Sequence, residues 1–204
     1  MKSIFLAIVF SLLIISTGFS AFEPSVKAES VAPVFLENLY KEADFVGFVK
    51  ILSGDAEHYE AAMYKAEVQI AYKGAKNKEI IYFSRREGYQ IGNEYLAFFK
   101  KSDKTIGQNI VKDIKNSSAP YDAEKGLFYI MYGGYSIMHA DYECAFEDND
   151  YRDQCDWSVR LNANQILLPK TLKAYPDNPR DFREKYVRRK EIEVALEDLK
   201  RKNP

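Results

Sequence analysis

Two cysteines, Cys144 and Cys155, are the only thiols in the chain, and ten residues lie between them. In an oxidising compartment an isolated pair at this spacing most simply forms one disulfide. Closing so short a loop would stabilise the fold by roughly 3 kcal/mol in the chain-entropy account. The functional alternative is a redox-active dithiol, but the chain has no Cys-x-x-Cys motif. The spacing therefore predicts a structural Cys144–Cys155 bridge.

Acidic residues between the cysteines are the second chemical candidate. Hard cations such as Ca²⁺ bind clustered carboxylates, and Asp148, Asp150 and Asp153 are the candidate ligands here. The segment lacks the glycine and the terminal glutamate of an EF-hand loop. The alternative is a solvated acidic loop closed by the disulfide.

Histidines and serines supply no catalytic motif. Neither His58 nor His139 belongs to a metal-ligand spacing such as His-Glu-x-x-His. Ser136 follows Gly134-Tyr135 as in a nucleophile elbow, but Met138 stands where the second glycine is needed. We therefore predict that Ser136 is an ordinary strand residue. We also predict no cofactor and no enzymatic activity. The alternative is an enzyme whose acidic active site carries no recognisable motif.

The first twenty residues predict the compartment. Met1-Lys2-Ser3 gives a positive start, and an apolar run follows from Ile4 to Ile15. Gly18 and Ser20 are the small residues of a cleavage site. Because the run is well short of the ~20 apolar residues that span a bilayer, it indicates a secretory signal peptide of residues 1–20. We expect a secreted or periplasmic protein with no membrane span.

The bulk composition narrows the class of the mature protein. Residues 21–30 are polar and predict a flexible lead-in, and residues 31–204 have the size of a single domain. Aromatic residues make up 14% of the chain, which favours a β-rich fold. The formal net charge is −1, and the strand lysines alternate with acids, so we expect no nucleic-acid partner.

Hydrophobic periodicity predicts a barrel over residues 44–140. The alternation is strictest at 64–73, where one face holds Tyr64, Ala66, Val68, Ile70 and Tyr72. The two glycines Gly133-Gly134 connect the last two apolar segments as a hairpin turn would. The expected strands cover residues 44–52, 64–73, 79–84, 94–100, 127–132 and 135–139.

Two helices and a loop complete the expected order. A short helix over 33–43 follows from Pro33 and from apolar residues at three- and four-residue spacing. A disulfide loop spans 141–160. The pair Asn178-Pro179 signals the start of a longer, partly basic helix over 179–201. The fold class is thus mainly β, a five- to six-stranded OB-type barrel flanked by a short N-terminal and a longer C-terminal helix.

Three short motifs resemble the netrin-like module, the OB-type barrel of the tissue inhibitors of metalloproteinases. They are Asp44-Phe45-Val46-Gly47, the strand end Tyr72-Lys73-Gly74, and Glu94-Tyr95-Leu96. The resemblance covers residues 43–140. Those inhibitors clamp a catalytic zinc with an N-terminal Cys-x-Cys, whereas this chain has no cysteine before Cys144. Their mechanism is therefore not carried over.

What the resemblance implies is a binding face made by the same loops. On this chain they are Gly54 to Tyr59 and Arg85 to Gln90, with the partner-binding candidates His58, Tyr59, Arg85, Arg86 and Tyr89. We expect an exported, non-enzymatic protein-binding or inhibitor-like module. The alternatives are an envelope enzyme with an acidic site and an envelope structural protein that docks through its basic C-terminal helix.

Overall fold

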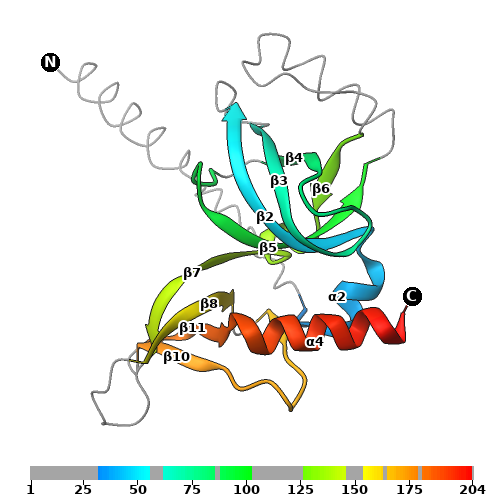
Figure 1. The fold of residues 1–204 in the computed structure, drawn as a ribbon. Helices are drawn as coiled ribbons and strands as arrows, with labels where there is room; N and C mark the ends of the chain where they lie inside the picture. The colour runs from blue at the N-terminus through cyan, green and yellow to red at the C-terminus, as the bar shows by residue number, and fades with distance from the viewer. Residues whose placement is uncertain are drawn as a thin grey trace, which may run out of the picture. The chain divides into compact units, whose positions relative to one another are not determined.

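The computed structural model describes residues 32–55, 62–85, 88–102, 126–145, 154–162, 165–178 and 181–203, which belong to one compact unit. The unit is mainly β (Figure 1). Its elements up to the centre of the chain are β1 (Val34–Phe35), α2 (Leu36–Glu42), β2 (Phe45–Asp55), β3 (Ala62–Lys73), β4 (Ile80–Arg85), β5 (Glu94–Lys101) and β6 (Phe128–Ile130). Then follow the 3-10 turn η1 (Tyr132–Gly134), β7 (Ile137–Ala145), β8 (Gln154–Asn162), β9 (Ile166–Leu167), β10 (Tyr175–Asn178), β11 (Asp181–Arg188) and α4 (Arg189–Lys202).

Five strands close into a barrel, in the order β5-β2-β3-β4-β6 and back to β5. Strands β4 and β6 pair in parallel, and the other neighbours pair antiparallel. This is the connectivity of an OB-type barrel, as the sequence predicted. Figure 1 shows these strands from cyan to green.

The same nine-stranded sheet continues from β5 beyond the barrel, and this continuation is called the second sheet. Its first half, Glu94 to Ala97, pairs with β7, and β8, β11 and β10 follow in that order. The outermost strand, β10, contains Pro176 next to a shift in register. Proline cannot donate a ladder hydrogen bond, so this edge is a poor template for another strand.

Strands β2 and β5 are buried on both faces. Phe45 and Phe99 point into the barrel, where their rings stack with centroids 5.7 Å apart. Phe48 and Phe98 point the other way, into a second core that holds the helices. This explains why both segments are almost continuously apolar in sequence, a pattern typical of strands without a solvent face.

Helices α2 and α4 cover the second core. Leu36, Leu39 and Tyr40 of α2 are buried, as are Ile192 and Leu196 of α4. Helix α4 contacts β8 and β11 of the second sheet and β3 of the barrel, while α2 contacts β5. Figure 1 shows the two helices next to each other on one side of the barrel. Neither described helix is long and apolar enough to cross a membrane.

The four expected strands at 44–52, 64–73, 79–84 and 94–100 are confirmed as β2 to β5. The prediction that all the apolar residues of β3 share one face is wrong, however. Phe48 pairs with Ile70 but Val49 pairs with Val68, so Gln69 is an extra residue in the ladder. Beyond this bulge the strand turns over: Val68 faces the barrel, whereas Ile70 and Tyr72 face the helices.

The prediction of a hairpin at Gly133-Gly134 is also wrong. Strands β6 and β7 form, but they do not pair with each other. Both pair with the same edge of β5, β6 with Phe99–Lys101 and β7 with Glu94–Ala97. Ser136, expected on a strand, lies fully buried in the connection, where its Oγ accepts a hydrogen bond from the Met131 N–H at 2.8 Å.

The C-terminal helix expected over 179–201 begins only at Arg189, because the preceding segment is strand β11. Pairing with β8 on one side and β10 on the other gives this segment two ladders, which overrides its helical charge pattern. The loop expected over 141–160 is likewise replaced by strands. Strand β7 continues to Ala145, and β8, which pairs with it, begins at Gln154. The short helix covers 36–42 instead of 33–43, since Val34 and Phe35 pair with β9.

We predict that Gly47→Ala and Gly74→Ala each destabilise the protein by about 1–3 kcal/mol or more. A Cβ on Gly47 would lie 2.4 Å from the carbonyl oxygen of Ile70, the residue after the bulged Gln69. Gly74 has φ +76°, and its Cβ would lie 1.8 Å from the Asp44 carbonyl oxygen. Gly88→Ala is the matched control, because among the described residues, its chain neighbours aside, no atom lies within 4 Å of its added Cβ. Chemical denaturation measures all three, and a Gly47→Ala protein as stable as Gly88→Ala would contradict this reading.

Candidate functional site: a groove between two helices

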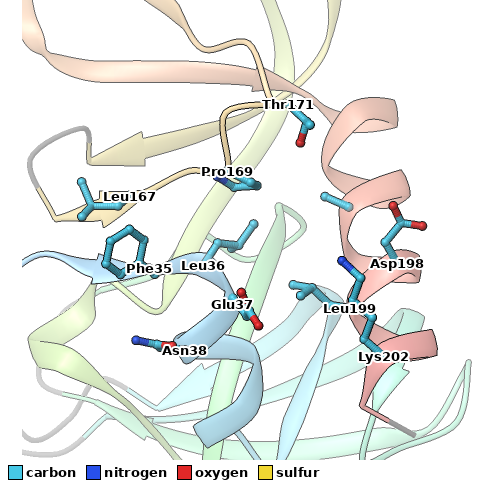
Figure 2. Close-up of a pocket in the computed structure, with 11 residues that line it drawn as sticks. Phe35, Leu36, Glu37, Asn38, Leu167, Pro169, Thr171, Asp198, Leu199 and Lys202 are labelled. Carbon is cyan, nitrogen blue, oxygen red and sulfur yellow. The ribbon is translucent and has the colours of Figure 1, made fainter.

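An open groove of about 320 Å³ lies where the start of α2, strand β9 with its following turn, and the second half of α4 meet (Figure 2). The volume is near the lower end of the roughly 300–1,000 Å³ of ligand pockets. Its lining residues are Phe35, Leu36, Glu37, Asn38, Leu167, Pro169, Thr171, Ala195, Asp198, Leu199 and Lys202. Three segments far apart in sequence therefore form it.

The groove has an exposed apolar wall and a buried apolar floor. Phe35 and Leu167 are Cα partners in the parallel β1–β9 pair, and the two residues are 55% and 37% exposed. Figure 2 shows them beside each other, with α4 across the groove. Leu36 and Leu199 are buried beneath, in the core shared by the two helices. Large exposed apolar side chains above a packed floor are typical of a surface that binds another molecule.

Charged residues of both signs form the rim. Glu37 pairs with Lys41 at 2.8 Å, and the hydrogen bond and charge of Lys41 lower the pKa of that carboxyl. On α4, Asp198 pairs with Arg201. Lys202, which also lines the groove, lies one helical turn after Asp198. Each carboxylate thus already has a cation on its own helix. The arrangement suits an apolar side chain with polar flanks better than general acid–base chemistry, which needs an acid or base free to exchange its proton.

A partly buried charge network fixes the other end of α4. Arg189, at the first position of the helix, donates to both carboxylate oxygens of Glu94, at 3.0 and 2.9 Å, and to Glu193 at 2.7 Å. Its guanidinium lies 4.3 Å from the centre of the Phe48 ring. Burial lowers the pKa of Arg189, but the two carboxylates more than offset this and raise it. The network ties the start of β5 to α4.

One of the loop residues predicted to bind a partner, Tyr89, packs against the aromatic side chains of the barrel core. Its ring packs against those of Tyr64, Phe83 and Tyr95, with centroids 5.2–5.8 Å apart. Its backbone N–H donates to the Tyr64 hydroxyl at 3.0 Å. Tyr89 is therefore a half-buried packing residue, and its role in partner binding stays a prediction.

The other predicted site residues are only partly placed. Arg85 ends strand β4. The remaining partner and calcium candidates lie outside the described residues: His58, Tyr59, Arg86, Asp148, Asp150 and Asp153. Cys144 and Cys155 are direct Cα partners in the antiparallel β7–β8 ladder.

His139 is half-buried, and its neighbours account for it. Its Nε2 lies 2.9 Å from the Asn93 amide nitrogen, and its ring lies 5.2 Å from that of Tyr95. A carboxylate oxygen of Asp141 lies 4.0 Å from its Nε2. Within the ranges that the structure describes, no three His, Cys, Asp or Glu side chains come together as metal ligands would.

Sequence reasoning missed the groove. The sequence pattern predicts Phe35 inside the short helix over 33–43 and predicts no element at Leu167. The available signal was the apolar segment Ile166-Leu167-Leu168 that ends at Pro169. Nothing in its local pattern shows that it pairs with residues more than a hundred positions earlier.

Comparison of the chain with protein-family models, with curated proteins and with solved structures finds no match. The likeness to the netrin-like module thus rests on the three short motifs, and it stays a prediction. The motif glycines have a local physical explanation, because Gly47 and Gly74 occupy positions where backbone approaches backbone.

Arg189→Ala is expected to cost about 2–4 kcal/mol of stability, because it leaves Glu94 largely buried without its cation. The exposed pair Arg201–Asp198 on the same helix is the matched control, and Arg201→Ala should change stability by less than about 1 kcal/mol. Denaturant unfolding of both variants checks this. Equal effects would show that the Arg189 network contributes no more than a surface ion pair.

Proposed function

We propose that this chain is an exported, non-enzymatic protein-binding module, and that its groove holds an apolar side chain of a partner polypeptide. The observation that carries the proposal is the exposed pair Phe35 and Leu167 above a buried floor. Aromatic and aliphatic anchors in such pockets dominate the free energy of many protein interfaces.

The chemistry of the rim favours a polypeptide over other ligands. Glu37, Asp198 and Lys202 present both signs of charge, which complements a peptide backbone with mixed side chains. A nucleic acid would need a basic surface with stacking aromatics, and the groove lining holds two acids and one base. An open groove of this size also leaves a small substrate accessible to water, unlike the enclosed sites of most enzymes.

The N-terminal segment supports export. The apolar run from Ile4 to Ile15, after Lys2 and before the small residues Gly18 and Ser20, has the order of a secretory signal peptide. In the compartment beyond that export step, oxidising conditions allow disulfides. The facing positions of Cys144 and Cys155 on β7 and β8 agree with this, because directly opposed residues in an antiparallel pair have Cα atoms about 4.5–5.5 Å apart, within the range of disulfides.

Groove variants test the function. A photo-crosslinking residue at position 167, in mature protein incubated with an extract of its own compartment, should capture a defined protein. Phe35→Asp should reduce that capture at least tenfold, since it places a charge in the apolar wall. The fold should survive, because the Phe35 side chain is already half exposed.

Val194 provides the control. It is 62% exposed on α4 but does not line the groove. A crosslinker at 194 should capture the same protein poorly, and Val194→Asp should leave capture at position 167 unchanged. Equal capture from both positions, or no effect of Phe35→Asp, would sink the groove as the partner site.

The proposed disulfide has its own test. Peptide mapping of the non-reduced exported protein should recover a linked Cys144–Cys155 pair. Replacing both cysteines with alanine should lower the free energy of unfolding by about 3 kcal/mol. A reducing agent should lower that of the wild type equally and leave the variant unchanged. Recovery of two free thiols from the exported protein would contradict the proposal.

A further inference from the structure

We propose that the polypeptide segment bound in the groove is acidic, with carboxylates next to the apolar side chain that enters the groove. This inference rests on the proposed function and adds the charge of the partner to it. The charges on the three segments that form the groove carry it. The ion pairs within each helix leave two lysines, Lys170 and Lys202, without an ion-pair partner among the residues that the structure describes.

Both carboxylates that line the groove are already neutralised. Glu37 of α2 pairs with Lys41 at 2.8 Å, and Asp198 of α4 pairs with Arg201. Each pair lies within one helix, at four- and three-residue spacing, so no partner is needed to bring the charges together. A basic side chain entering the groove would therefore have to compete with Lys41 or Arg201 for a carboxylate.

Lys202 is a cation of the groove that no carboxylate neutralises. It lines the groove from the last turn of α4, and Figure 2 shows its nitrogen on the groove side of that helix. Its charge acts from one helix to the other. The pKa of Glu37 is lowered first by the hydrogen bond and charge of Lys41, and it is lowered further by the charge of Lys202. A carboxylate bound in the groove would experience the same attraction.

The third wall of the groove adds a positive charge and no negative one. Between Ile166 and Leu172 the only charged residue is Lys170. It is exposed, and it stands between Pro169 and Thr171, which both line the groove. The charged residues of the lining, their ion-pair partners and this lysine therefore comprise more cations than acids, namely Lys41, Lys170, Arg201 and Lys202 against Glu37 and Asp198.

An acidic segment is the polypeptide that complements this surface. Its apolar side chain would contact Phe35 and Leu167, and its carboxylates would meet Lys170 and Lys202. Such complementarity governs the choice of partner and the rate of association more than the affinity. A basic segment would be repelled, and a neutral one would gain nothing from either lysine. The end of α4 does not reverse this, because the three cations in its last turn exceed the partial negative charge of a helix C-terminus.

Crosslinking of three labelled peptides tests the charge of the partner. Each peptide has Leu-Phe at its centre, and its flanking residues are all glutamate, all glutamine or all lysine. With the photo-crosslinker at position 167 and low salt, the mature protein should capture the glutamate peptide about tenfold more than the lysine peptide, and the glutamine peptide to an intermediate extent. Added salt should reduce the difference, because both lysines are exposed.

A charge reversal tests the role of Lys202. Lys202→Glu should lower the capture of the glutamate peptide by about three- to fivefold and raise that of the lysine peptide. Lys200→Glu is the matched control, because it makes the same change of net charge in the same turn of α4 but does not line the groove. It should change the capture of either peptide by less than about a factor of two. Circular dichroism checks that both variants are folded.

Failure of this inference can be told apart from failure of the proposed function. Phe35→Ser removes the apolar anchor without adding a charge. Equal capture of the three peptides that Phe35→Ser abolishes would keep the groove as the binding site and overturn its preference for acids. Preference for the lysine peptide, or a preference for glutamate that Lys202→Glu leaves unchanged, would also overturn the inference. Capture of no peptide, or capture that Phe35→Ser leaves unchanged, would overturn the groove itself. Loss of the glutamate peptide on adding an equal concentration of decanoate would overturn the inference in favour of a fatty acid.

Discussion

The constraint on which the structure depends is that strand β5 belongs to two sheets and two cores at once. One edge pairs with β2, and the other is divided between β7 and β6. Tyr95, Ala97 and Phe99 fill the barrel, while Leu96 and Phe98 fill the helical layer. Every side chain from Tyr95 to Phe99 is buried, so a polar substitution at any of them would cost stability on one side or the other.

The groove follows from this arrangement. Helix α2 precedes β2 and packs on the outer face of β5, and α4 is tied to the first residue of β5 by Arg189 and Glu94. The space between the two helices is therefore set by the strand beneath them. Strand β9 completes the wall through its pairing with β1. A binding surface built on such rigid supports loses little conformational entropy when a partner is bound.

The barrel was predictable because its strands carry their own signal. The alternation in 64–73 and the doubly apolar segments 44–52 and 94–100 depend only on neighbouring residues. The errors came where distant pairing decides the outcome. Asp181 to Arg188 has helical charge spacing, yet two flanking strands make it β11. Gly133-Gly134 has turn chemistry, yet both neighbouring strands pair with β5. The groove was missed for the same reason, since β1 and β9 are two residues each.

Native-state hydrogen exchange tests most directly whether β5 and α4 form one cooperative unit. The account predicts that backbone amides of Leu96 to Phe98 and of Ile192 to Leu199 exchange only through global unfolding, with the same free energy of opening. The Arg189→Ala variant should then lower the free energy for α4 well below that for β5. Opening of α4 in the wild type at a free energy several kcal/mol below that of β5 would contradict the account, because one wall of the groove would then move independently of the strand proposed to place it.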